Sequence, residues 1–97
     1  MASQECAACF AANLRRRRRV AGFSQEELGR RSGLHRTAIG LLERGARMPR
    51  VDTLVKLAAA LEIQPDMLIE GISWTPGDAQ PGEFSFALDR TRSVGLS

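Results

Sequence analysis

Residues 24–45, SQEELGRRSGLHRTAIGLLERG, constrain the fold of this chain more than any other stretch. Their apolar spacing is that of two short amphipathic helices, yet Gly29, Gly33 and Gly40 lie inside them. A glycine inside a helix costs about 1 kcal/mol relative to alanine, so these positions need a geometric reason. We expect Gly33 to make a left-handed turn between the helices and Gly29 to let them cross closely. We expect Gly40 on the exposed side of the second helix, where another surface can approach the backbone.

Start and stop signals place the other elements around this pair. Ser24 and Glu27 have the spacing of a capping box, in which the serine hydroxyl accepts from the Glu27 amide and the Glu27 carboxylate reaches back. After Gly71 the apolar residues alternate, which predicts two short strands around a long loop. The predicted helices cover residues 8–21, the stretch from Gln25 to the RSGL break, residues 36–44 and residues 51–61, with a short fifth helix over residues 65–70.

Composition and charge restrict the class of protein. The 97 residues suffice for one small domain and are too few for a deep catalytic cleft with a second domain. Residues 1–50 contain eleven arginines and four glutamates, whereas residues 51–97 contain three basic and seven acidic residues. A basic half favours a polyanion as partner. No catalytic triad, phosphate-binding loop or carboxylate pair is visible, so we expect no enzyme activity.

The amino terminus and the hydropathy pattern bear on location. The first basic residues follow the apolar ones, which is the reverse of a secretory signal. No apolar run approaches the roughly 18 residues of a membrane span. We therefore expect a cytoplasmic protein without a membrane partner.

Two short helices joined by a tight glycine turn, within a cluster of helices, are typical of a helix-turn-helix. Over roughly residues 9–70 the chain also resembles the Cro/C1-type, or XRE-type, helix-turn-helix family of bacterial and phage repressors. The residues that match in register are 24–28, 32–34, 39, 42–45 and 49. The resemblance implies a mainly α, five-helix lambda-repressor-like domain. It also implies a sequence-specific regulator, usually a repressor that binds a palindromic operator in double-stranded DNA as a homodimer.

The resemblance also assigns roles to individual residues. The helix over residues 36–44 corresponds to the recognition helix of the major groove, where Arg36 would read guanine and Leu41 would contact a thymine methyl. Gln25 corresponds to a residue that holds a phosphate with its amide and the helix N-terminus. The base-contacting candidates are His35, Arg36, Thr37 and Leu41, and the family usually has serine or threonine at the position of His35. The phosphate-contacting candidates are Gln25, Arg18, Arg44 and Arg47. The resemblance also implies a structural ion pair between Arg18 and Glu43.

Two patterns in the N-terminal half have alternative explanations. The arginines at residues 15–19 are spread around a helix in steps of about 100°, so they are either mostly solvated or supply one or two contacts to DNA. Cys6 and Cys9 share a helix face, but a zinc site needs four ligands, which a second chain would have to complete. We expect no metal and no cofactor, with Cys9 partly buried and Cys6 unattached near a frayed end.

The C-terminal residues leave the partner open. Trp74, Phe84 and Phe86 either cover the core of their own chain or pair with a second chain, and a small-molecule pocket is the remaining alternative. With Ile69 they are the dimerisation candidates. We expect an N-terminal arm over residues 1–8, a DNA-binding domain over 9–70 and a strand-like dimerisation tail over 71–97 that ends frayed. The other functions to consider are a DNA-binding antitoxin that binds a protein through this tail and the controller of a restriction–modification system.

Overall fold

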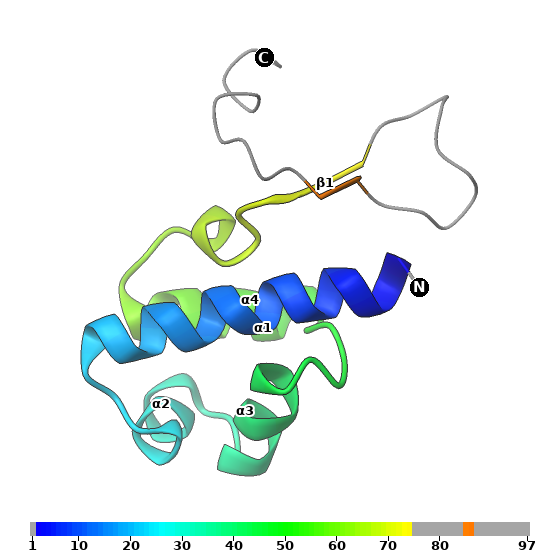
Figure 1. Ribbon diagram of the computed structural model, residues 1–97. Helices are drawn as coiled ribbons and strands as arrows, with labels where there is room; N and C mark the ends of the chain where they lie inside the picture. Colours follow the sequence, from blue (N-terminus) through cyan, green and yellow to red (C-terminus); the bar gives the residue numbers. More distant parts are fainter. Residues whose placement is uncertain (1, 75–84, 87–97) are drawn as a thin grey trace.

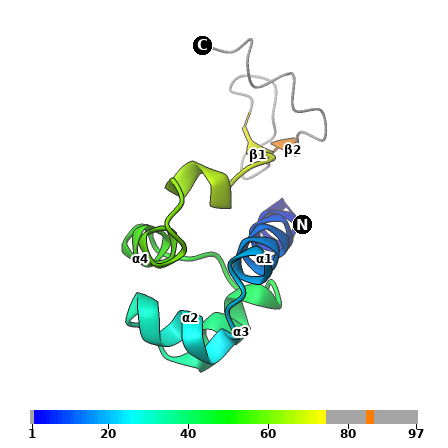
Figure 2. The ribbon, with the colours of Figure 1, turned by 90° about the vertical axis from the view of Figure 1, so that its left-hand side faces the viewer.

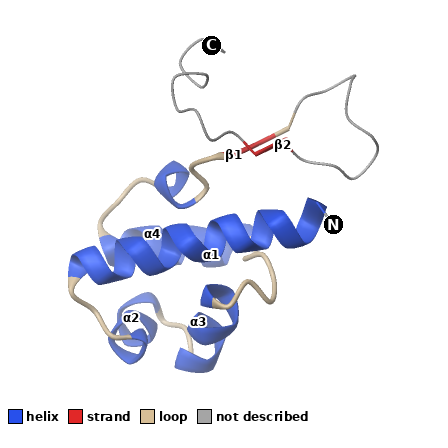
Figure 3. Ribbon diagram, viewed as in Figure 1, coloured by secondary structure: helices blue, strands red, loops and turns tan. Residues whose placement is uncertain are grey.

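The computed structural model describes residues 2–74 and 85–86, which form four α-helices, one 3-10 turn and one pair of short strands (Figure 1). The helices are α1 (Ala2–Ala21), α2 (Gln25–Ser32), α3 (Arg36–Glu43) and α4 (Val51–Leu61), followed by the 3-10 turn η1 (Pro65–Leu68). The strands β1 (Ile72–Ser73) and β2 (Ser85–Phe86) pair antiparallel, with Ile72 opposite Phe86. Figure 3 shows how small the strand content is beside the helices.

α1 and α4 lie beside each other at the centre of the domain. Figure 2 shows both nearly end-on, with η1 above them and with α2 and α3 below. Each of these elements contributes at least one fully buried side chain to a single core. Burial of such a side chain contributes about 1.5–3 kcal/mol relative to its exposure to water. The largest fully buried side chains are Phe10, Leu14, Leu28, Ile39, Leu57 and Leu68.

α1 begins earlier than the sequence pattern predicts. It includes residues 2–7, and Cys6 and Ala7 are buried in the same stripe as Phe10 and Ala11. A Cβ on Gly45 would lie 3.5 Å from the Ala8 Cα, so the turn after α3 packs on this first part of α1. Cys6 is therefore buried in the domain, not unattached near a frayed end. No helix in the described part of the chain is both long and apolar enough to cross a membrane.

The predicted fifth helix is a single 3-10 turn, which corrects the expected five-helix architecture. The Met67 amide donates to the Gln64 carbonyl at 3.0 Å and the Ile69 amide to the Asp66 carbonyl at 3.2 Å, which are i to i+3 bonds. Gly71, with φ of 89°, then turns the chain away. The segment is too short for a ladder of i to i+4 bonds.

The turn between α2 and α3 has the geometry that its glycines predict. Gly33 ends α2 in the left-handed region, with φ of 76°. A Cβ on Gly29 would lie 2.6 Å from the Leu34 carbonyl oxygen, so only glycine permits this crossing of the two helices. The Ser24 hydroxyl accepts from the Glu27 amide at 2.9 Å. The Glu27 carboxylate accepts from two arginines of α2, in place of the return bond of a full capping box.

Gly40 is buried, contrary to our expectation that its backbone is open to a docking surface. The side chains of Gln25 and Arg44 lie over it. A Cβ at Gly40 would be 3.8 Å from the Gln25 Oε1 and 3.6 Å from the Arg44 Nη1, which are ordinary van der Waals distances. Gly40 is therefore covered by two flexible side chains and not by backbone.

A buried carboxylate holds α3 against α1. Arg18 donates to Glu43 through Nε at 2.5 Å and Nη2 at 2.9 Å, and its Nη1 donates to the Phe23 carbonyl at 2.8 Å. Gln25 Nε2 donates to the same carboxylate at 3.0 Å. Arg15 adds a hydrogen bond to the main-chain carbonyl of Glu43. Three helices thus meet at one side chain that is 3% exposed.

The segment after η1 is bound to the other face of α1. Asn13 is buried, and its Nδ2 donates to the carbonyls of Leu68 at 3.1 Å and Glu70 at 2.9 Å. The Cys9 thiol also donates to the Glu70 carbonyl, at 3.5 Å. These bonds satisfy carbonyls that the short η1 leaves without helical partners.

We expect Gly29→Ala and Gly40→Ala to have opposite effects on stability. The methyl at residue 29 would collide with the Leu34 carbonyl, and relief of such overpacking costs about 1–3 kcal/mol. The methyl at residue 40 would meet only movable side chains, so alanine should be neutral or gain up to about 1 kcal/mol of helix propensity. Urea unfolding followed by circular dichroism measures both. Equal free energies of unfolding for the two variants would contradict this explanation of Gly29.

Glu43→Gln should destabilise the domain by about 3–5 kcal/mol, because the Arg18 side chain, 13% exposed, would lose its counter-charge inside the protein. Arg30→Gln removes one partner of an exposed pair on α2 and is the matched control, with an expected cost of at most about 1 kcal/mol. Thermal unfolding compares them. A Glu43→Gln protein as stable as the control would show that the buried pair does not hold α3.

Candidate nucleic-acid interface

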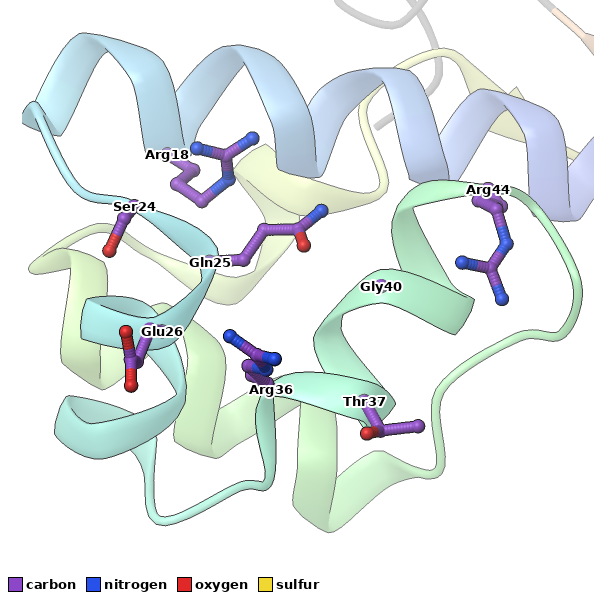
Figure 4. Close-up of a pocket in the computed structure, with 8 residues that line it drawn as sticks. All are labelled: Arg18, Ser24, Gln25, Glu26, Arg36, Thr37, Gly40 and Arg44. Carbon is purple, nitrogen blue, oxygen red and sulfur yellow. The ribbon is translucent and has the colours of Figure 1, made fainter.

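An open groove of about 600 Å³ lies between the start of α2 and the outer face of α3 (Figure 4). Five of the residues singled out from the sequence as site candidates line it, together with Ser24, Glu26 and Gly40. The α2 amino end, whose main-chain N–H groups carry partial positive charge, opens at this groove. The five candidates are Arg18, Gln25, Arg36, Thr37 and Arg44.

Arg36 and Thr37 occupy the first turn of α3 and are exposed. Within the described residues, Arg36 has neither a hydrogen bond nor an ion pair, so its five N–H donors are available to an external acceptor. A guanidinium fits two acceptors in one plane, as a guanine edge or a phosphate presents them. This is the part of the groove with the chemistry of nucleic-acid recognition.

Arg44 and Arg47 are exposed after the end of α3. Arg44 folds back over Gly40 at the rim of the groove. Arg47 does not line this groove; it borders a smaller hollow of about 110 Å³ beside Met48, Pro49 and Arg50. Of these two predicted phosphate contacts, Arg44 therefore lies at the rim of the groove and Arg47 lies outside it.

Arg18 and Gln25 line the groove but are already engaged. The Arg18 guanidinium is directed to Glu43 and Phe23, and its hydrogen bond to Glu43 raises the pKa of the guanidinium above its usual value. The Gln25 Nε2 group donates to Glu43. A phosphate that bound here would meet the backbone amides at the start of α2 and those N–H groups of the two side chains that Glu43 and Phe23 leave free.

His35 and Leu41 lie differently from the other base-contacting candidates. His35 is exposed and forms the N-cap of α3, where its ring accepts from the Thr37 amide. Leu41 is half-buried and is not among the groove-lining residues. The structure thus brings Arg36 and Thr37 together in the groove, with His35 at the start of the same helix and Leu41 outside the groove.

Most of the arginine run is committed to contacts within the chain. Arg15 and Arg18 bind the end of α3, as described above. Arg16 and Arg17 lie 3.5 and 3.9 Å from the Glu70 carboxylate. Only Arg19, which is exposed, has no such contact within the described residues. Within the described residues the run therefore mainly contacts the chain itself; that one or two of its arginines also reach DNA stays a prediction.

Two more arginines are directed to an acid on their own helix. Arg31 and Arg30 both donate to Glu27, and the hydrogen bond from Arg31 contributes most to lowering the pKa of that carboxyl. The Arg31 guanidinium also lies 4.4 Å from the centre of the Phe23 ring, in a cation–π contact. Arg36, Arg44 and Arg47 are left as the arginines of the α2–α4 region with the most freedom to meet a polyanion.

The cysteines have the character of structural residues. Cys6 is buried and Cys9 half-buried, and both thiols are free. Burial raises the pKa of both thiols, which lowers the thiolate fraction and so the affinity for a metal or an oxidant. Among the residues described, no three histidine, cysteine, aspartate or glutamate side chains gather in a metal-binding arrangement.

The dimerisation candidates lie at the end of the described domain. Ile69 and Trp74 are 38% and 47% exposed. Phe86 lies in β2, and Phe84 falls outside the described residues. Their part in association stays a prediction.

Sequence reasoning missed several groove residues. Ser24 was assigned only a capping role, and Glu26 none, although both line the groove beside Gln25. The bond from Gln25 to Glu43 joins positions 18 apart, and nothing in a single sequence indicates it. Arg15 precedes Arg18 by three residues, so helical spacing places both on one face and offered a signal for its contact with α3.

Known proteins resemble this chain over the same region. The HTH_3 helix-turn-helix family model matches residues 14–68. The control protein C.SmaI of Serratia marcescens is 44% identical over 60 residues, which cover 62% of this chain and 71% of that protein. The crystal structure of the restriction-modification controller protein C.AhdI from Aeromonas hydrophila has a TM-score of 0.62 and 42% identity, covering 64% of this chain and 94% of that chain.

A structure that contains DNA is also similar. The P22 c2 repressor protein, in complex with synthetic operator 9T, has a TM-score of 0.60 and 32% identity, and covers 64% of this chain and 94% of that chain. The glycine turn, the exposed first turn of α3 and the matched family model lead to one conclusion. The chain belongs to the HTH_3, or Cro/C1-type (XRE), family of helix-turn-helix DNA-binding transcription regulators, which are not enzymes.

Proposed function

We propose that this protein binds a specific operator in double-stranded DNA by inserting the start of α3 into the major groove. The observation that carries the proposal is the Arg36 guanidinium, exposed at the first turn of α3 and without a partner among the described residues. In this pose Arg36 reads guanine O6 and N7, and Thr37 contacts a neighbouring base edge. Leu41, half-buried, offers at most an apolar contact to a thymine methyl.

The phosphate contacts fix the pose of α3 and carry little sequence information. The backbone amides at the amino end of α2, beside Gln25, form one contact. Arg44 and Arg47 form two more on the side of α3 nearer α4. Arg18, which also lines the groove, acts first through Glu43, as a positioning residue for α3.

The proposed regulator acts as a repressor that binds a palindromic operator as a homodimer. Two copies would place their α3 helices in half-sites about 34 Å apart, one helical turn of DNA. The exposed Ile69 and Trp74 support association through the segment after η1. Control of a restriction–modification system is the form of regulation favoured by the similarity to C.SmaI and C.AhdI, which are named as control and controller proteins.

A second candidate is a DNA-binding antitoxin or another component that binds an unlike protein through the C-terminal tail. The exposed side chains of Ile69 and Trp74 also favour this candidate, because exposed apolar side chains can bind an unlike protein as well as a second copy of the chain. The two candidates share the DNA contacts and differ in the occupant of this surface.

Arg36→Ala and Arg47→Ala should weaken DNA binding in different ways. Loss of Arg36 should cost about 1–3 kcal/mol and relax discrimination at one base pair, whereas loss of Arg47 should weaken all sequences alike and reduce the salt slope by about 1. Fluorescence anisotropy on duplexes selected by the wild-type protein, at several salt concentrations, separates the two effects.

Lys56→Ala, on α4 and outside both hollows, is the control for loss of a single positive charge. It should leave the discrimination and nearly all of the affinity intact. If Arg36→Ala discriminates between duplexes as well as the wild-type protein does, the direct readout by Arg36 is wrong.

Trp74→Ala should weaken self-association, because the substitution removes exposed aromatic surface that a second chain would cover. Val55→Ala removes apolar surface from an exposed position on α4 and is the matched control. Sedimentation velocity over a range of concentrations gives the dissociation constants. An unchanged dimer in Trp74→Ala would contradict this interface. An unlike protein that binds the wild-type protein but not Trp74→Ala would then favour the second candidate.

A further inference from the structure

His35 is the single histidine of the chain and is the N-cap residue directly before α3. Its backbone is extended, with φ of −71° and ψ of 146°, as an N-cap requires. The Thr37 amide donates to the His35 Nδ1 at 3.0 Å. The imidazole therefore performs the task that serine, threonine, asparagine or aspartate performs at most helix starts.

The capping bond determines the protonation state of the ring. A neutral imidazole has one nitrogen that accepts and one that carries a proton. Since Nδ1 accepts from Thr37, the proton must be on Nε2. Rotation of the ring by half a turn would replace Nδ1 with a carbon and break the cap, so the ring orientation is fixed as well. His35 is exposed, and within the described residues its Nε2–H has no hydrogen-bond partner, so this donor is available to an external acceptor.

We propose that His35 is an operator-contacting residue that donates its Nε2–H to a hydrogen-bond acceptor of the DNA. The proposal rests on the proposed function, in which the start of α3 meets DNA. The acceptor is a major-groove base atom, such as guanine O6 or N7, or else a phosphate oxygen. The cap excludes the opposite polarity: this ring cannot accept from the amino group of cytosine or adenine while Nδ1 is bound to Thr37.

The helix cap makes this donor more effective than a free histidine side chain. A ring already held by Thr37 loses little rotational freedom when it binds, so less of the hydrogen-bond energy is spent on ordering it. The same bond gives α3 a satisfied amino terminus. In this proposal one side chain both caps the amino terminus of α3 and contacts the DNA next to it.

The first test needs no DNA. Nitrogen-15 NMR of the full chain labelled at histidine reports one imidazole, because there is no other histidine. At a pH where the ring is neutral, we expect the nitrogen shifts of the Nε2–H form and a long-range coupling pattern with Nδ1 unprotonated. An Nδ1–H ring, or an equal mixture of the two forms, would overturn the proposal.

The second test separates the cap from the donor. His35→Ser retains an N-cap oxygen but has no ring donor, whereas His35→Ala loses both. We expect His35→Ser to unfold at about the wild-type urea concentration and His35→Ala at a lower one. On a duplex that the wild-type protein selects, His35→Ser should lose roughly tenfold in affinity, since one hydrogen bond to a base is worth about a factor of ten.

Substituted duplexes identify the acceptor. If it is a base atom, His35→Ser loses discrimination at one base pair, and a base analogue that lacks the acceptor at that pair, such as 7-deazaguanine for guanine N7, weakens the wild-type protein but not the variant. If it is a phosphate, His35→Ser weakens all sequences alike, and one methylphosphonate weakens only the wild-type protein. Either pattern supports the donor.

Two failures are distinguishable. A His35→Ser protein with wild-type affinity and discrimination, on a duplex that the wild-type protein does discriminate, overturns the role of His35 alone. A wild-type protein that discriminates between no duplexes overturns the proposed function, and with it the role of His35 as a reader, whatever the NMR result.

Discussion

The buried carboxylate of Glu43 is the interaction on which the rest of this domain depends. It accepts from Arg18 of α1 and Gln25 of α2 while belonging to α3, so three helices meet at one charge. A carboxylate removed from water is tolerated only when opposite charge and hydrogen bonds surround it, and here both are present. Its requirement for those partners restricts the angle at which α3 can leave the domain. The orientation of α3 thus depends on the ion pair and hydrogen bonds of Glu43 as well as on the packing of its apolar side chains in the core.

The same arrangement engages most of the charge of the strongly basic helix α1 within the domain. Four of the five arginines of α1, residues 15–18, pair with Glu43 or Glu70 or donate to main-chain carbonyls, so their charges contribute to the fold. Among the described arginines, those left without an intramolecular partner are few: Arg19 on α1, and Arg36, Arg44 and Arg47 on or after α3. Net charge alone points to the densest basic run as the interface, whereas the intramolecular contacts leave isolated arginines such as Arg36 as the candidates.

The features that sequence predicted correctly are those with a local cause. Gly33 in the left-handed region, Gly29 at the helix crossing and the Ser24 cap each follow from the chemistry of one residue and its neighbours. The features that it missed depend on distant residues. The start of α1 rests on small buried residues with weak periodicity, and the burial of Gly40 depends on how Gln25 and Arg44 fold over it. For the site, motif matching gave five of the groove-lining residues, but not which of their polar groups form hydrogen bonds within the domain.

The two faces of α1 have different attachments, and this has a mechanical consequence. One face binds α3 through Arg15 and Arg18, and the other binds the segment after η1 through Asn13. The recognition helix and the start of the tail are therefore fixed to a single rigid rod. If two chains associate through the tail, the length and tilt of α1 would set the distance between their two α3 helices.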